Sequence, residues 1–304
     1  MEILVCIKPV PDPDKYGDLR IDPETKRLVR EGVPAVINPA DKNALEEALR
    51  LREQFGGSVT VLSMAPAFSR DRMVESLAMG ADRAFLLSDP LFGGADTYVT
   101  SRVLAEAVRK IAASSEASSE VPAAAPETSA EAAEAAGAPG FDLILAGNES
   151  ADGGTSHVPA QLAEWLELPH ICGARSLEVA PVCGEVAGDA SAAEADAVLR
   201  AACKSEEGNL IFECPLPAVV AVGREANKPR LVNAMGIIKA RKKPLTIWSN
   251  EDLGLDPEGL GLGGSPTKAG QLFEPDLGRE GASLGDDPEA AAARILELIE
   301  KAGV

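Results

Sequence analysis

The sequence is poor in the residues that build metal centres and disulfide frameworks. It has two histidines and five cysteines, and the cysteines form no Cys-x-x-Cys pair. An odd number of scattered cysteines indicates neither a disulfide framework nor a zinc site. No histidine–carboxylate cluster at metal-ligand spacing stands out in the sequence either. Free thiols in a reducing cytoplasm fit this pattern best.

Basic residues and long apolar runs are also scarce. The chain has 29 Lys and Arg against 48 Asp and Glu, a net charge of -19, which repels nucleic-acid phosphates and anionic lipid. The segment Met1–Lys8 lacks a basic region, and its apolar run is far shorter than the roughly 20 residues of a membrane span. We therefore expect no nucleic-acid binding, no export, no membrane insertion and a cytoplasmic location.

The apolar content that is present suffices for one substantial core. Of the 304 residues 45% are hydrophobic, so we expect one main domain. Strands are predicted at Glu2–Val10, Ser58–Ala65, Ala84–Ser88, Phe141–Ala146 and Ala218–Val222, and helices at 38–55, 70–79, 96–113 and 157–166. This alternation predicts an α/β fold with a doubly wound, mostly parallel sheet. Helices should cover both faces, and ligands should bind at the carboxyl ends of the strands.

Four segments interrupt or extend that pattern. We expect a small hairpin from Leu19–Asp22 and Arg27–Arg30, a disordered Ser/Ala/Glu/Pro insertion at 112–140, a second hairpin with a long acidic loop within Arg175–Phe212, and a C-terminal arm with a helix from Asp286. Ala218–Val222 is predicted to be the last core strand. The expected division is a nucleotide-binding domain at 1–250 and an arm for subunit docking at 251–304.

The most informative junction is the loop Gly147–Ser156, which follows a predicted buried strand and precedes a helix. Glycine-bearing loops of this kind let backbone N–H groups converge on a phosphate. The loop matches neither Gly-x-Gly-x-x-Gly nor a P-loop, so an ordinary turn with a helix cap remains the alternative. Glu149 and Asp152 would repel phosphate, and they are expected to bind ribose hydroxyls or to face solvent.

A second junction is Asn38-Pro39-Ala40-Asp41, which reads as a helix start. Asn38 is expected to accept from the first-turn amides, with Pro39 at the first helical position and Asp41 facing the positive dipole end. That role explains the pattern without a ligand, and a ligand contact remains the alternative. His157 is expected to be a helix-start residue, because no nucleophile accompanies it as a general base would require.

A basic surface follows the last predicted core strand. It comprises Arg224–Arg230 and Lys239–Lys243. A charge run is ordinarily a solvated face, but a positive surface on an acidic protein suits an acidic partner.

Taken in order, several segments resemble the β subunit of electron transfer flavoproteins. They are Val5–Asp12, Val36–Ala48, Ala78–Asp82, Leu145–Val158, Asn227–Arg230 and Ile238–Lys243. The resemblance implies an adenine-nucleotide α-hydrolase-like, Rossmann-like domain that pairs with an FAD-bearing α subunit as a heterodimer. It assigns nucleotide contacts to Cys6, Asn38, Pro39, Ala40, Asp41, Met64, Asp96, Thr97, Gly147, Asn148, Glu149, Ser150, Ala151, Asp152, Gly153, Gly154, Thr155, Ser156, His157 and Val158.

The resemblance leaves two nucleotides open. Respiratory relatives hold a structural AMP, whereas flavin-bifurcating relatives hold a second FAD, and Gly93–Thr97 and Asn38–Asn43 resemble the bifurcating group more closely. FAD is therefore favoured over AMP. In bifurcating relatives, electrons of NADH divide at this flavin between the α-subunit FAD and a low-potential acceptor.

The resemblance also concerns partners. Ala234 and Met235 occupy the partner-recognition segment, where many relatives carry a leucine. A dehydrogenase is the expected partner, and ferredoxin or flavodoxin the candidate acceptor.

The nucleotide loop departs from the family pattern at one charged position. The family loop ordinarily carries a cation where this chain has Asn148.

Two other function classes are alternatives. An adenylating enzyme of the ATP-pyrophosphatase type would want a Gly/Ser-rich loop after the first strand, where this chain has Lys8–Asp12. The other alternative is a nucleotide-sensing module without redox chemistry, which co-purification with a flavin-bearing partner would separate from an electron carrier.

Overall fold

The computed structural model describes residues 1–18, 20–21, 28–29, 33–116, 140–181, 197–206, 208–268, 270, 278, 281 and 283–302. The chain divides into two compact units. The larger comprises Met1–Arg20 with Val29–Gly270, and the smaller comprises Ile21–Leu28 with Gln271–Val304. Residues 251–270 thus belong to the larger unit. The docking role predicted for 251–304 stays a prediction.

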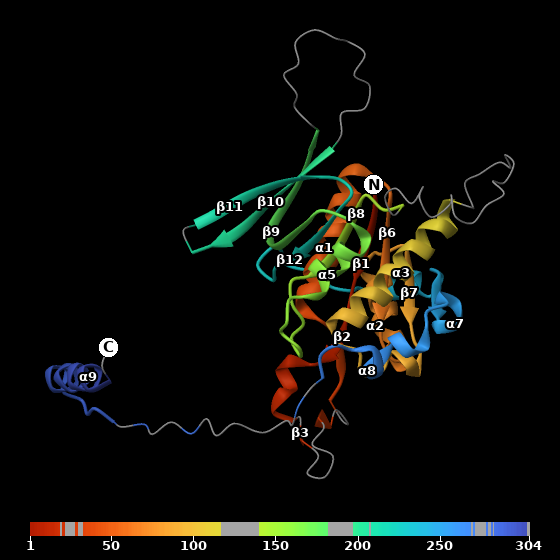
Figure 1. Ribbon diagram of the computed structural model, residues 1–304. Coiled ribbons are helices and arrows are strands. Elements are labelled where there is room, and N and C mark those ends of the chain that lie inside the picture. Colours follow the sequence, from red (N-terminus) through yellow and green to blue (C-terminus); the bar gives the residue numbers. More distant parts are fainter. Residues whose placement is uncertain are drawn as a thin grey trace, which may run out of the picture. The chain divides into compact units, whose positions relative to one another are not determined.

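A nine-stranded sheet organises the larger unit (Figure 1), with the order β11-β10-β9-β12-β8-β1-β6-β7-β13. The strands are β1 Glu2–Cys6, β6 Ser58–Met64, β7 Arg83–Leu87, β8 Leu143–Gly147, β9 His170–Pro181, β10 Ala197–Ser205, β11 Gly208–Pro215, β12 Ala218–Val222 and β13 Leu245–Trp248. All neighbouring pairs from β9 to β13 across the sheet are parallel, whereas β10 and β11 extend it antiparallel. The predicted doubly wound, mostly parallel sheet is confirmed.

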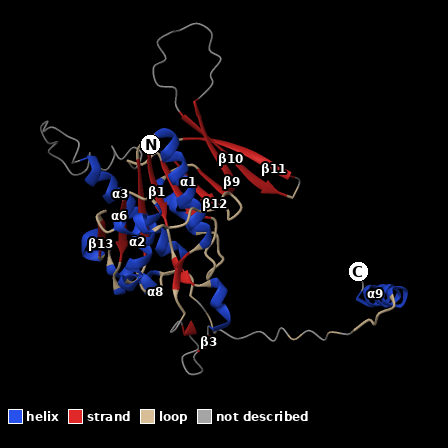
Figure 2. Ribbon diagram, turned by 180° about the vertical axis from the view of Figure 1, so that it is seen from behind, coloured by secondary structure: helices blue, strands red, loops and turns tan. Residues whose placement is uncertain are grey.

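Helices cover both faces of this sheet (Figure 2). They are α1 Pro39–Phe55, α2 Arg70–Met79, α3 Thr97–Glu116, α5 Val158–Leu166, α6 Ala234–Ala240, α7 Asn250–Leu253 and α8 Gly261–Gly264, with short helical turns at Pro13–Asp18, Ala67–Ser69, Pro90–Phe92 and Pro257–Gly259. Ile3 and Val5 of β1 pack in a core with α1 and α2, whereas Leu4 packs on the opposite face with α3 and α5. The alternation of side chains along a strand therefore divides β1 between two cores.

The order in which successive strands are added to the sheet reverses at β1. From β1 the chain runs through β6 to β7 on one side, and then returns to β8 on the other side. Leu4 lies opposite Thr60 of β6 and Ile144 of β8. The carboxyl ends of β1 and β8 consequently flank a topological switch point, where open α/β sheets bind ligands.

Several predicted boundaries need correction. Ala218–Val222 is β12 as predicted, but it is not the last core strand, because β13 follows and pairs with β7. Four residues after Pro244 give too short a pattern to recognise. The run predicted as one strand over Glu2–Val10 ends at Cys6, and β2 Pro9–Pro11 pairs instead with β5 Ala35–Ile37.

The predicted irregular segments are described in part. The first hairpin appears as β3 Arg20–Ile21 and β4 Leu28–Val29, and the second as β9, β10 and β11. The prediction of an insertion at 112–140 placed its start too early, because residues 112–116 continue α3 and Ala112 is buried. Residues 117–139, and the acidic loop at 182–196, lie outside the described residues.

The smaller unit contains the predicted terminal helix. Helix α9 spans Pro288–Ala302, and its Ile295, Leu296 and Ile299 are exposed. None of the helices among the described residues is long and apolar enough to cross a membrane.

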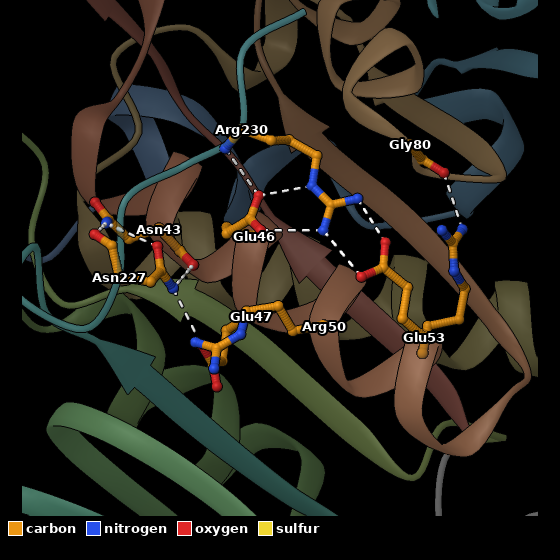
Figure 3. A network of polar contacts seen from close by, with 9 residues as sticks. Asn43, Glu46, Glu47, Arg50, Glu53, Gly80, Asn227 and Arg230 are labelled. Carbon is orange, nitrogen blue, oxygen red and sulfur yellow. Dashed lines mark hydrogen bonds and ion pairs between the residues drawn. The ribbon is translucent and has the colours of Figure 1, made fainter.

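A polar clamp fastens the segment after β12 along helix α1 (Figure 3). The Arg230 guanidinium donates to both Glu46 oxygens, at 2.8 and 3.0 Å, and its Nη1 lies 2.6 Å from Glu53. Asn43 Nδ2 donates to the Asn227 carbonyl at 2.8 Å, and Asn227 Nδ2 donates to the Asn43 carbonyl at 3.0 Å. These carboxylates raise the pKa of Arg230 above its ordinary value.

We expect Arg230→Ala to lower the free energy of unfolding by about 2–3 kcal/mol, because it leaves the buried Glu46 carboxylate without its cation. Urea unfolding measures this change. The matched control is Arg200→Ala, whose partner Glu213 is exposed and whose loss should cost under about 0.5 kcal/mol. Equal effects of the two substitutions would contradict the structural role of the clamp.

Candidate functional site

Asn38 connects the start of α1 to the loop after β8. Its Nδ2 donates to Asp41 Oδ1 and to the Glu149 carbonyl, both at 2.8 Å, and its Oδ1 accepts from the Ala151 N–H at 3.0 Å. The expectation that Asn38 caps α1 is wrong, since its side chain makes no cap hydrogen bond. The amide group is used instead to bind the loop, which sequence spacing alone does not reveal.

The Asp41 carboxylate is the centre of this junction. Its Oδ2 accepts from the Lys8 N–H at 2.6 Å, and its Oδ1 accepts from the Gly147 N–H at 3.1 Å as well as from Asn38. The side chain is buried. One carboxylate therefore joins the ends of β1 and β8 to the first turn of α1.

The end of β8 approaches the first turn of α1 so closely that position 147 requires glycine. A Cβ at that position would lie 2.7 Å from the Asp41 nitrogen and 2.8 Å from the Ala40 carbonyl carbon, and closer still to Asp41 Oδ1. Two of these atoms are backbone and cannot rotate away. A side chain at 147 would push α1 away from β8.

Burial is the largest cause of the pKa shifts of Asp41 and Cys6. It raises the pKa of Asp41 to about 7, although the hydrogen bonds from Asn38, Lys8 and Gly147 and the Lys8 charge oppose the shift. Burial, and then the Asp41 charge, raises the pKa of Cys6 to about 12. Cys6 is therefore a thiol at neutral pH and is not activated as a nucleophile.

Most residues of the loop beyond Gly147 are exposed. Asn148 N–H donates to the Val222 carbonyl at 2.8 Å, which ties the loop to β12. Gly154 and Ser156 have φ of 58° and 57°. Glu149, the stretch 151–155 and His157 are exposed as whole residues, although the Asp152 side chain is 13% exposed, and Ser150 is half-buried. His157 precedes α5 without making a side-chain cap, and Val158 begins the helix.

The other predicted contact residues, Met64, Asp96 and Thr97, lie in or directly before other elements. Met64 ends β6 and is partly buried against the core on the α3 side. Asp96 Oδ1 accepts from the Val99 N–H at 3.0 Å, and its Oδ2 accepts from the Thr267 N–H and hydroxyl at 2.9 and 2.6 Å. Thr97 begins α3. Asp96 thus holds Thr267 against the start of α3. A nucleotide contact by Asp96 stays a prediction.

Ala234 and Met235 open helix α6. The helix is capped by Asn233, whose Oδ1 accepts from the Gly236 N–H at 2.8 Å, and it packs on α2. Met235 is 61% exposed, and Leu231, Ile237 and Ile238 are exposed beside it. Four exposed apolar side chains thus lie within or next to the predicted partner-recognition segment.

Sequence reasoning missed Lys8 as a site residue. Its backbone N–H contacts Asp41, and its Nζ lies 2.6 Å from Asp152 Oδ1 and 3.3 Å from Ser150 Oγ. One signal could have identified it: the loop carries two carboxylates without a lysine or arginine, and Lys8 lies two residues after the end of the adjacent strand β1.

In the described ranges no group of three or more His, Cys, Asp or Glu residues could hold a metal ion. Cys6, Cys172, Cys203 and Cys214 are free thiols, and Cys183 lies outside the described residues.

Comparison with known proteins gives a consistent result. The family model described as "Electron transfer flavoprotein domain" matches residues 25–118 and 116–253. The "Electron transfer flavoprotein subunit beta" of Thermoanaerobacterium thermosaccharolyticum is 38% identical over 300 residues, which cover 98% of each chain. The "Caffeyl-CoA reductase-Etf complex subunit CarD" of Acetobacterium woodii is 34% identical over 99% of each chain. "Protein FixA" of Azorhizobium caulinodans is 35% identical over 97% of this chain and 92% of its own.

Gly147→Ala should lower the free energy of unfolding by more than about 2 kcal/mol, because its methyl group collides with the backbone of α1. Urea or thermal unfolding measures the loss. Gly263→Ala in α8 is the control, since a Cβ there meets nothing within 4 Å. That variant should change stability by under about 1 kcal/mol. A stable Gly147→Ala protein would argue against the tight junction.

The raised pKa of Asp41 predicts a pH dependence of stability. Because the folded chain holds this proton up to about pH 7 and the unfolded chain only to about 3.8, the contribution of Asp41 falls as pH rises between these values. The slope is at most roughly 1.4 kcal/mol per pH unit. Urea unfolding at several pH values should show a smaller decline from pH 5 to 8 in Asp41→Asn than in the wild type. Parallel pH profiles of the two proteins would refute this assignment.

Proposed function

Because the chain belongs to the electron transfer flavoprotein family, we propose that it is the β subunit of such a protein and binds an adenine nucleotide at the switch point between β1 and β8. The observation that carries this proposal is the hydrogen-bonded junction of Asn38 and Asp41 with Gly147, Glu149 and Ala151. It presents an exposed glycine-bearing loop ahead of α5, where backbone N–H groups and the helix dipole suit a phosphate.

The residues at the junction fit such a ligand. The Asp41 carboxylate is buried beneath the loop and bonded to three donors, so it does not face an incoming phosphate. Ser150 carries a hydroxyl that can donate to phosphate, and the exposed Glu149 carboxylate suits ribose hydroxyls. Cys6 and Met64, at the ends of β1 and β6, supply small or adaptable apolar surface.

We favour FAD over AMP as this nucleotide. The resemblance of Asn38–Asn43 and Gly93–Thr97 to the bifurcating group supports FAD, as does a relative named as a subunit of a caffeyl-CoA reductase–Etf complex that aligns over 99% of both chains. FAD, when bound, supplies both one-electron and two-electron chemistry. This chain's residues would bind and orient the cofactor and keep it close to a second FAD in the α subunit. With AMP in the site, the subunit would be a non-bifurcating carrier.

The proposal includes protein partners. Two relatives are named as subunits, and exposed apolar side chains support docking by this chain. Leu231 is 92% exposed beside α6, and Leu210, Ile211 and Phe212 are exposed on the edge strand β11. We assign the α subunit as the heterodimer partner and the surface around Met235 to a dehydrogenase. Ferredoxin or flavodoxin as acceptor, NADH as donor in the heterodimer, and a cytoplasmic location stay predictions.

Co-expression with an electron transfer flavoprotein α subunit should yield a yellow heterodimer, detected by gel filtration with absorbance. Acid release and chromatography then identify the ligands. About two FAD per heterodimer supports the preferred form, whereas one FAD with one AMP rejects it in favour of the AMP-binding alternative. Nucleotide binding without a flavin-bearing partner would favour a sensing module. A colourless monomer that binds ATP would contradict the proposal altogether.

A further inference from the structure

The loop after β8 has an electrostatic problem as a phosphate site. Residues 147–157 include Glu149 and Asp152 but neither lysine nor arginine. A carboxylate close to a phosphate repels it, and the repulsion grows where water is partly excluded. Backbone N–H groups alone would have to offset this repulsion, so a cation from elsewhere in the chain would strengthen binding considerably.

Lys8 is placed to be that cation. Its ammonium Nζ lies 2.6 Å from Asp152 Oδ1 and 3.3 Å from Ser150 Oγ. It also lies against the loop backbone, since a Cβ added at Gly153 would be 3.8 Å from Nζ. The Lys8 side chain is 48% exposed, whereas that of Asp152 is 13% exposed. The ammonium therefore covers the acid and presents its other side to solvent.

The backbone of Lys8 is fixed at the same time. Its N–H donates to Asp41 Oδ2 at 2.6 Å, and its carbonyl accepts from the Asn38 N–H at 2.9 Å. The side chain thus starts from a rigid point at the end of β1. Its long stem crosses to the loop after β8 on the far side of the switch point.

We propose that Lys8 binds and neutralises a phosphate of the adenine nucleotide, with Asp152 and Ser150 holding its ammonium over the loop. An ammonium has three donors, and within the described residues Ser150 and Asp152 account for two of them. A phosphate oxygen at the loop backbone can accept from the ammonium while the Asp152 contact persists. This inference rests on the proposed function and names the residue of the site that recognises the anion.

The assignment predicts that Lys8 contributes to affinity only where the ligand carries phosphate. Lys8→Met keeps most of the apolar stem and removes the charge. It should weaken AMP and ADP binding about tenfold or more, as expected for a lost charge-assisted hydrogen bond, while adenosine affinity changes less than about twofold. Lys8→Arg should retain AMP affinity within about threefold, because the guanidinium keeps the charge and the donors.

Isothermal titration of the full chain, freed of nucleotide, with adenosine, AMP and ADP tests this. The matched control is Lys42→Met, since Lys42 also lies in the Asn38–Asn43 region but pairs with Glu75 on α2. Its AMP affinity should stay near that of the wild type. Thermal unfolding of each variant checks that the fold is intact.

The outcomes separate this inference from the proposed function. A loss in Lys8→Met that is equal for AMP and adenosine, or no loss for either, overturns the role of Lys8 while nucleotide binding stands. Failure of Lys8→Arg to retain AMP affinity also counts against charge recognition. A wild-type chain that binds none of the three ligands overturns both proposals.

Discussion

The arrangement of the site depends on one buried carboxylate. Asp41 accepts hydrogen bonds from the backbone N–H of Lys8 just beyond β1, from Asn38 ahead of its own helix and from Gly147 at the end of β8. The helices that follow β1 and β8 lie on opposite faces of the sheet, which opens a crevice at the carboxyl ends of these strands. Asp41 bridges the two strand ends at this crevice. Here a side chain that is costly to bury does so, and its pKa of about 7 reflects that cost.

Helix α1 extends the influence of this junction. Its first turn organises the loop after β8, while Asn43, Glu46 and Glu53 farther along hold Asn227 and Arg230. The segment so held leads directly into α6 and its exposed Met235. One rigid helix therefore positions both the proposed nucleotide site and the proposed docking surface.

Much of the fold follows from the sequence, because buried strands and amphipathic helices have strong periodicities. Helix Arg70–Met79 and strand Ala218–Val222 have the predicted bounds. The strand Leu245–Trp248 was missed because four residues carry little pattern. At the candidate site, the structure brings together the loop and Asn38–Asp41, both singled out from the sequence, but the hydrogen bonds that join them were not predicted. Asn38 has the same local pattern as a helix cap, and its use in binding Glu149 and Ala151 depends on tertiary contacts that local sequence does not encode.

The central claim is that the loop at 147–154, organised by Asn38 and Asp41, receives the nucleotide. Amide hydrogen exchange of the full chain with and without AMP tests it most directly. The account predicts slower exchange on binding in residues 147–154 and at the start of α1, with unchanged exchange in the edge strand β11 and in α9. Protection confined to any other part of the chain, with these two segments unaffected, would contradict it.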